Sequence, residues 1–169
     1  GGAAKGMAVQ MNQFFPEGAL LDTPRNQAII RSAAGLAEAA MEGTVLEARA
    51  VLCDAEHNLH VEMPCMEGVI PYFEGAIGIA EGTTRDIALI SRVSKPVCFT
   101  VNGFEHLPDG RRRAVLSRRD AQERCRDLYI SRLRRGDVIP ARVTRLETFG
   151  AFCDIGCGLP ALMPIASIS

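Results

Sequence analysis

The stretch that decides the fold is Gly136-Asp-Val-Ile-Pro-Ala-Arg142, because the same chain also contains Gly43-Thr-Val-Leu-Glu-Ala-Arg49. Each copy continues through an acidic residue and a short polar turn to a segment that ends in Met-Pro or Ile-Pro. A sequence that is repeated within one chain indicates two copies of one structural unit. We therefore expect two related β-rich units, one built on each copy.

The unit that starts at the second copy contains few predicted strands. Apolar runs bounded by turn residues predict three strands, at residues 138–146, 151–155 and 161–165. A half barrel of this kind leaves open hydrogen-bonding edges and an uncovered apolar face, and such edges recruit partners. We therefore expect that the chain is part of a longer protein or that another chain completes this sheet, for example by self-association.

The first copy begins a unit with more strands. The same signals predict strands at 45–53, 59–63, 68–70, 87–93, 97–104 and 113–116. The segment His106-Leu-Pro-Asp-Gly110 predicts a hairpin turn before the last of them. These strands are sufficient to close a barrel, and we assign residues 43–117 to this first domain.

Two helices are expected outside the strands. Thr23 and Pro24 provide an N-cap and a proline at the first helical position, so a helix is predicted over 23–42 after an irregular segment at 1–22. Ser117 and Asp120 form a capping-box pattern that begins a second helix, which links the two units over 118–133. Its predicted apolar face contains Ala121, Cys125, Leu128, Tyr129 and Leu133, and its polar face contains Arg118, Arg119, Arg126 and Arg134.

Residues 134–169 resemble the opening half of an S1-type RNA-binding domain, and Leu116-Ser-Arg-Arg-Asp-Ala121 resembles the segment that closes one such domain and leads to the next. The resemblance is to tandem-domain proteins of the bacterial ribosomal protein S1 type. It implies a mainly β fold with helices, in which 43–117 is a divergent S1-type OB-fold, a five-stranded Greek-key barrel. Residues 134–169 would then be a second, truncated S1-type half barrel.

The resemblance also selects an RNA-binding site. Aromatic residues at the positions of Phe149 and Phe152 are associated with RNA contact in S1-type domains, although many members have a histidine where this chain has Pro164. Rings of this kind stack on bases, while nearby cations meet the phosphates. The residues expected to contact RNA are Arg134, Arg135, Arg142, Arg145, Phe149 and Phe152.

The charge distribution favours the second unit for RNA binding. The net charge is -1, but residues 1–100 have 7 Lys or Arg against 12 Asp or Glu, whereas residues 101–169 have 12 Arg against 8 Asp or Glu. In the first unit His57 and His60 align with the two phenylalanines, among Glu56, Glu62 and Glu67. Since acidic surfaces repel phosphate, we expect the first unit to bind RNA less well.

Other site types are disfavoured by spacing and context. The six cysteines lack the dense spacing of a disulfide scaffold and are expected to be reduced, mostly buried thiols. Cys153 and Cys157 lack the second pair that zinc sites usually show, and Cys53 with His57 and His60 fits a hydrogen-bonded turn better than a metal site. The glycines at 75, 78 and 82 lack the strand and helix context of a phosphate loop.

The resemblance implies a protein that binds single-stranded RNA or mRNA and associates with translation and the ribosome. The sequence itself predicts a cytoplasmic protein with no membrane partner. No catalytic group, metal or cofactor site stands out, so we expect no enzymatic activity and no cofactor. Two alternatives remain open. The chain could be the RNA-binding or docking part of a larger RNA-processing enzyme or fusion protein, or both units could dock proteins only.

Overall fold

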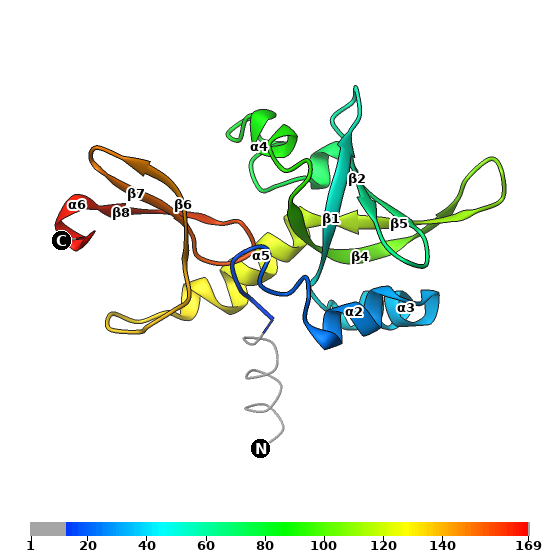
Figure 1. Cartoon of the computed structure of the whole chain (residues 1–169), viewed down its shortest axis with the longest axis horizontal. Coiled ribbons are helices and arrows are strands. Elements are labelled where there is room, and N and C mark those ends of the chain that lie inside the picture. Colours follow the sequence, from blue (N-terminus) through cyan, green and yellow to red (C-terminus); the bar gives the residue numbers. More distant parts are fainter. Residues whose placement is uncertain (1–12, 169) are drawn as a thin grey trace, which may run out of the picture.

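The computed structural model of the chain describes residues 13–168, so residues 1–12 of the expected irregular segment lie outside it. The described chain is a mixed α/β protein that contains a closed five-stranded barrel and a separate three-stranded sheet. Helix α5 (Arg118–Leu128) runs between them, and Figure 1 shows the N-terminal segment beside this helix.

The barrel confirms the expected closed, OB-like architecture. Its strands are β1 (Leu46–Cys53), β2 (Leu59–Glu62), β3 (Glu67–Ile70), β4 (Pro96–His106) and β5 (Arg112–Ser117). They close in the order β1-β2-β3-β5-β4, and the β3–β5 pair is parallel while the other pairs are antiparallel. The strands form here because their apolar residues alternate: in β2, Leu59 and Val61 are fully buried while Glu62 is exposed.

The barrel core is made of aliphatic side chains with one central ring. Leu46, Val97, Phe99 and Leu116 are almost completely buried there together with Leu59. Full burial of such a side chain contributes about 1.5–3 kcal/mol relative to leaving it in water. Together these side chains form the apolar interior that stabilises the barrel.

The prediction of a strand at 87–93 is wrong. The connection from β3 to β4 instead contains η1 (Tyr72–Glu74) and the short helix α4 (Ile87–Ile90). In α4 only Leu89 is fully buried, whereas Ile87 and Ile90 are 62% and 42% exposed. A short apolar run fits a helix as well as a strand, and here a single buried side chain is sufficient to anchor it.

The helix expected at 23–42 is divided in two. Thr23 caps α2 (Pro24–Ile30), as expected, and Gly43 ends α3 (Ala33–Glu42) in the left-handed conformation. Between them the hydroxyl of Ser32 accepts a 3.0 Å hydrogen bond from the amide of Gly35 and begins a new helix. A serine hydroxyl competes with the helical hydrogen bonds in this way, which explains the break.

Helix α5 is shorter than the expected linking helix, and one of its faces is buried. It ends at Leu128 and is followed by η2 (Ile130–Arg132), so the expected continuous helix to 133 is wrong. The Ser117 hydroxyl accepts from the amide of Asp120, but the Asp120 carboxylate accepts from the Thr100 hydroxyl, at 2.6 Å, and from Arg124. The capping box is therefore only half formed.

The face of α5 that was expected to be polar contains a buried residue. Ala121 and Cys125 are fully buried in a second core, together with Phe14 and Cys157, as the predicted apolar face requires. However, Arg118 is also buried, at 5% exposure, instead of facing water. Helix α5 therefore joins the barrel to the second sheet.

The second sheet repeats the first three strands of the barrel. It contains β6 (Arg142–Glu147), β7 (Gly150–Asp154) and β8 (Pro160–Pro164), followed by α6 (Ile165–Ile168). Arg142 pairs with Asp154 and Arg145 with Phe152, with a bulge between them in β6. In the barrel, Arg49 pairs with Glu62 and Leu52 with His60, with a bulge at the same place in β1. The sequence repeat is therefore also a repeat of register.

Candidate nucleic-acid interface

The β6–β7 hairpin holds the two rings that the sequence singles out. Phe149 lies in the tight turn, and Phe152 is the third residue of β7. The rings pack edge to face, with centroids 6.1 Å apart and an interplanar angle of 90°, which is a favoured aromatic geometry. Phe149 is 54% exposed and Phe152 is partly exposed. A ligand can therefore reach both rings.

Arg145 lies against one of these rings. Its guanidinium carbon is 4.6 Å from the centroid of Phe152, the residue with which it pairs across the strands. Its Nε also lies 2.8 Å from Glu147 Oε1 in an ion pair, and the side chain is 64% exposed. The contact is a cation–π interaction on an open surface. Cation and ring are thus presented together.

Strand alternation gives this sheet two different faces. Arg145, Phe152 and Leu162 stand opposite one another on the outer face. The inner face contains Ala151 and Cys153, which are 3% and 2% exposed. The ring and the cation therefore lie on the face that points away from the inner, apolar side.

The inner face is only partly covered. Val143, Leu146 and Met163 pair with its buried residues, yet they are 55%, 74% and 40% exposed. The expected completion of this sheet by another chain stays a prediction.

Gly150 holds the hairpin against β8. A Cβ at this position would lie 2.3 Å from the carbonyl oxygen of Met163. The neighbouring strand therefore approaches the backbone closely at Gly150.

The four arginines of the expected site fall into two groups. Arg142 lies on β6 near the rings, is 49% exposed, and places Nη2 3.6 Å from Asp154 Oδ2. Arg134 and Arg135 are exposed in the segment between η2 and β6. The structure thus brings Arg142 and Arg145 to the ring-bearing hairpin, whereas Arg134 and Arg135 precede it.

The equivalent place in the barrel is occupied by His60. Its Nε2 lies 2.9 Å from Asp54 Oδ2 and its Nδ1 lies 2.8 Å from Glu67 Oε1. Burial disfavours the charged ring, but the hydrogen bonds to Asp54 and Glu67 outweigh burial and raise the pKa of His60 above its ordinary value. An imidazole held between two carboxylates is poorly placed to stack on a base.

The neighbouring His57 belongs to a turn, as expected. Its amide donates to the Asp54 carbonyl, and Asp54 Oδ1 accepts from the amides of Glu56 and Asn58, each at 3.0 Å. Its Nδ1 lies 3.2 Å from Asp86. Within residues 13–168, the structure contains no group of three or more His, Cys, Asp or Glu side chains that could hold a metal ion.

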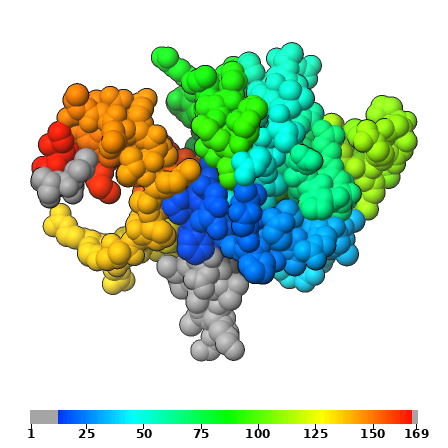
Figure 2. Space-filling view, viewed as in Figure 1, coloured from blue at the N-terminus to red at the C-terminus, as the bar shows by residue number. Residues whose placement is uncertain are grey.

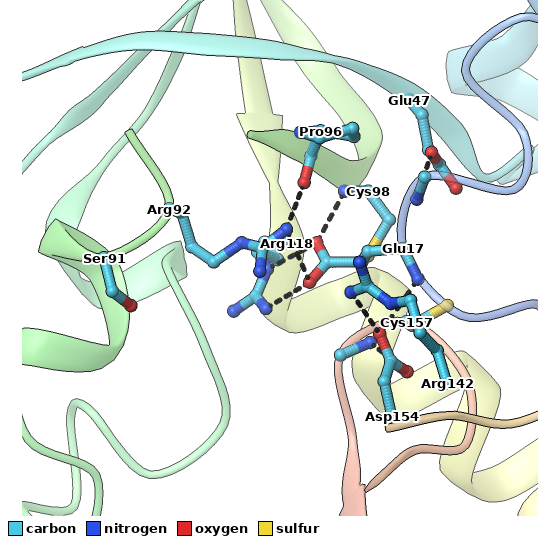
Figure 3. A network of polar contacts seen from close by, with 12 residues as sticks. Glu17, Glu47, Ser91, Arg92, Pro96, Cys98, Arg118, Arg142, Asp154 and Cys157 are labelled. Carbon is cyan, nitrogen blue, oxygen red and sulfur yellow. Dashed lines mark hydrogen bonds and ion pairs between the residues drawn. The ribbon is translucent and has the colours of Figure 1, made fainter. Parts of the chain in front are cut away.

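A buried polar network joins the N-terminal segment to the barrel and to α5 (Figure 3). Glu17 is 2% exposed, and Arg118 donates to its two oxygens from Nε at 2.9 Å and from Nη2 at 2.6 Å. The Cys98 amide adds a third bond, at 2.9 Å. Burial alone would raise the pKa of Glu17, but the charge and hydrogen bonds of Arg118 outweigh it and lower this pKa to about 2.

The same network extends to the second sheet through Asp154. Its Oδ2 accepts from the Glu17 amide at 2.9 Å, and its Oδ1 accepts from the amides of Gly156 and Gly158. Gln122 completes the connection, because it accepts from the Ile77 amide and donates to the Cys157 carbonyl. Sequence reasoning missed this network, since Glu17 appears only as part of a Phe-Pro-Glu-Gly turn.

A cavity of about 480 Å³ lies beside this network, and we name it the junction cavity. Its charged lining residues are Glu17, Arg92, Arg118, Arg142 and Asp154. They come from the N-terminal segment, the α4–β4 connection, α5, β6 and β7. In the space-filling view a notch separates the surface of the α4 region from that of the second sheet (Figure 2). The barrel and the second sheet thus share one cavity, which is lined by these charged groups together with apolar side chains. Arg142 connects it to the ring-bearing face.

Glu47 is a third buried carboxylate near the junction. Its oxygens accept from the amides of Gly18 and Leu20 at 2.7 and 3.2 Å. Burial raises the pKa of Glu47 to about 7, more than these hydrogen bonds lower it. The two glutamates at the N-terminal segment, Glu17 and Glu47, therefore have displaced pKa values, in opposite directions.

All six cysteines are free thiols, as expected. Cys98, Cys125, Cys153 and Cys157 are buried, whereas Cys53 and Cys65 are partly exposed. Burial raises the pKa of Cys98 to about 11, so this thiol is unreactive near neutral pH.

Compared with known proteins, the chain matches no protein-family model and none of the curated proteins. In the part of the chain that the structure describes, no helix has the length and apolar character needed to cross a bilayer.

Proposed function

We propose that the chain binds single-stranded RNA on the outer face of the β6–β7 hairpin. The observation that carries the proposal is the stacking of the Arg145 guanidinium on Phe152, beside the exposed ring of Phe149. Proteins hold single strands by stacking bases on aromatic rings while cations meet the backbone phosphates. The hairpin supplies both kinds of group on one accessible surface.

The proposal includes the S1-type assignment. The barrel is compatible with an OB-fold, and the shared register and bulge support a second unit that repeats its first three strands. As the resemblance to that family implies, the proposal includes binding of mRNA, association with the ribosome and a role in translation in the cytoplasm. The activity proposed is equilibrium binding, with no catalytic step.

The charge environment supports binding at the second sheet rather than at the barrel. His60, at the position equivalent to Phe152, is already bound by Asp54 and Glu67. On the β6–β7 hairpin the corresponding surface contains Arg142 and Arg145. A phosphate backbone is attracted to the second surface and repelled by the first.

Titration of a labelled single-stranded RNA, followed by fluorescence anisotropy, tests the proposal. Affinity should fall as salt rises from about 50 to about 200 mM, because phosphate contacts release counterions. Phe149→Ala and Phe152→Ala should each weaken binding by about 1–3 kcal/mol, the usual value of one stacked base. Phe73→Ala is the matched control, because Phe73 is a 58% exposed phenyl on η1 of the barrel and should have no effect.

The titration also separates the rival functions. A chain that docks proteins only would not bind RNA even at low salt, and that result would overturn the proposal. If Phe73→Ala weakened binding and the hairpin variants did not, the RNA site would lie on the barrel. Membership of a larger RNA-processing enzyme is compatible with binding and is tested by the full reading frame.

A further inference from the structure

The charges that line the junction cavity do not cancel. Its three guanidinium groups face two carboxylates, which leaves one positive charge in excess. Both carboxylates are already bound by donors: Glu17 by Arg118 and the Cys98 amide, and Asp154 by three backbone amides. The excess charge therefore belongs to Arg92 and Arg142.

Arg92 has hydrogen-bonding capacity that the protein does not use. Its Nη2 donates to the Pro96 carbonyl and lies 3.6 Å from Glu17 Oε1. Its Nε is buried and has no acceptor among the described residues. A buried donor without an acceptor is unfavourable. The side chain is 14% exposed, so part of it remains open to the cavity.

Arg142 is the second cation of the cavity whose carboxylate partner is also bound by other donors. It lines the same cavity, is 49% exposed, and lies 3.6 Å from an Asp154 oxygen that already accepts from the Glu17 amide. Its guanidinium can therefore turn toward a ligand without leaving a carboxylate unsatisfied.

From these observations we infer that the junction cavity binds a phosphodiester group between Arg92 and Arg142. A phosphodiester has one negative charge, which equals the excess in the cavity, and guanidinium groups bind phosphate oxygens in a forked geometry. A phosphate monoester has nearly two charges at neutral pH. It would therefore leave an unbalanced negative charge beside Glu17 and Asp154.

The position of the cavity suggests where this group comes from. On the outer face of the sheet, the Arg145–Phe152 pair is followed by the Arg142–Asp154 pair. Asp154 lies two positions after Phe152 on β7, a distance of about 7 Å along the strand. A single strand whose bases stack on the rings can therefore pass its backbone over Arg142 into the cavity. This step rests on the proposed RNA binding, although a small free phosphodiester has the same chemistry.

The experiment uses the full chain and two probes. In the RNA titration, Arg92→Gln should weaken binding several-fold and lower the slope of log affinity against log salt by about 0.7, the value of one phosphate contact on a single strand. Arg126→Gln is the matched control, since Arg126 lies on the exposed side of α5 and pairs with Asp127. In parallel, the Nε–H resonance of Arg92 is followed by NMR as dimethyl phosphate or inorganic phosphate is added.

The outcomes are distinct. If RNA binds but Arg92→Gln behaves like Arg126→Gln, and neither RNA nor dimethyl phosphate moves the Arg92 resonance, the inference is overturned while the proposed function stands. If RNA does not bind, the proposed function fails. The inference then survives only if dimethyl phosphate moves the resonance, which identifies a small phosphodiester as the ligand. A larger response to inorganic phosphate than to dimethyl phosphate would contradict the charge argument.

A second variant keeps the test informative if Arg92→Gln does not fold. Arg92→Lys retains the charge but loses the forked geometry. It should leave the salt slope unchanged and still weaken RNA binding. Unchanged affinity in a folded Arg92→Lys protein would count against the forked contact.

Discussion

The backbone amide of Glu17 donates a 2.9 Å hydrogen bond to Oδ2 of Asp154, which lies 137 positions later in the chain. The side chain of the same glutamate is held by Arg118 of α5 and by the Cys98 amide of β4. One residue therefore connects the barrel, the helix and the second sheet. The position of the ring-bearing hairpin relative to the barrel depends on this connection.

Glu17→Gln should destabilise the whole chain. Removal of the charge leaves the buried Arg118 without a counter-ion, which typically costs about 3–5 kcal/mol. Urea unfolding followed by circular dichroism measures the loss. Glu123→Gln is the control, because Glu123 is 43% exposed in its pair with Arg119 and should change stability by less than about 0.5 kcal/mol. Equal effects of the two substitutions would contradict the role assigned to Glu17.

The pH dependence of stability should contain a contribution from Glu47. Burial raises its pKa from 4.5 to about 7, so between these values the folded state binds a proton that the unfolded state has released. Stability from this group is therefore complete below pH 4.5 and is lost as pH rises to about 7. The loss amounts to roughly 3 kcal/mol, since one pKa unit corresponds to about 1.4 kcal/mol.

Glu47→Gln isolates that contribution, because the amide does not titrate. Its single oxygen can keep only one of the hydrogen bonds from the Gly18 and Leu20 amides, but the loss of the other does not vary with pH. The difference in unfolding free energy between wild type and variant should decline across this interval and be constant above it. His60 also has a raised pKa and loses stabilisation as pH rises, but it is present in both proteins and cancels in the difference. A difference that does not vary with pH would show that Glu47 titrates normally.

The strands of the barrel could be predicted because their information is local. Alternation in β2 and the turn before β5 are visible in a few residues, and the sequence repeat then predicts the second sheet. The prediction failed at α4, where four apolar residues have no period that separates helix from strand. It also failed at Ser32, because a hydroxyl that caps a new helix reads like any polar residue on an exposed face.

The junction could not be predicted, for a different reason. Its groups are brought together by tertiary packing: Glu17 and Arg118 are 101 positions apart, and no local pattern relates them. Arg118 lies in a helix rich in arginine, so its charge predicted an exposed side chain like those of the neighbouring arginines. The rings at Phe149 and Phe152 were selected through the resemblance to S1-type domains, because that resemblance is carried by a short stretch of sequence around them.

Gly150→Ala should destabilise the second sheet. The added methyl would lie 2.3 Å from the Met163 carbonyl oxygen, which belongs to the backbone and cannot move aside easily. Overpacking of this kind costs about 1–3 kcal/mol. In Gly103→Ala the new methyl meets nothing within 4 Å, so that strand variant should be neutral or slightly more stable. Thermal unfolding of the two proteins provides the comparison, and equal melting temperatures would argue against the close β7–β8 approach.

Substitutions of Arg145 should separate its charge from its planar shape. Arg145→Gln removes the phosphate contact and should lower the salt slope of RNA binding by about 0.7. Arg145→Lys retains the charge and should keep the slope, but it should weaken binding because an ammonium group does not stack on Phe152 as a guanidinium does. Anisotropy titrations at several salt concentrations measure both quantities, with Arg126→Gln as the unaffected reference. If lysine restored full affinity, the stacked arrangement of Arg145 and Phe152 would have no part in RNA binding.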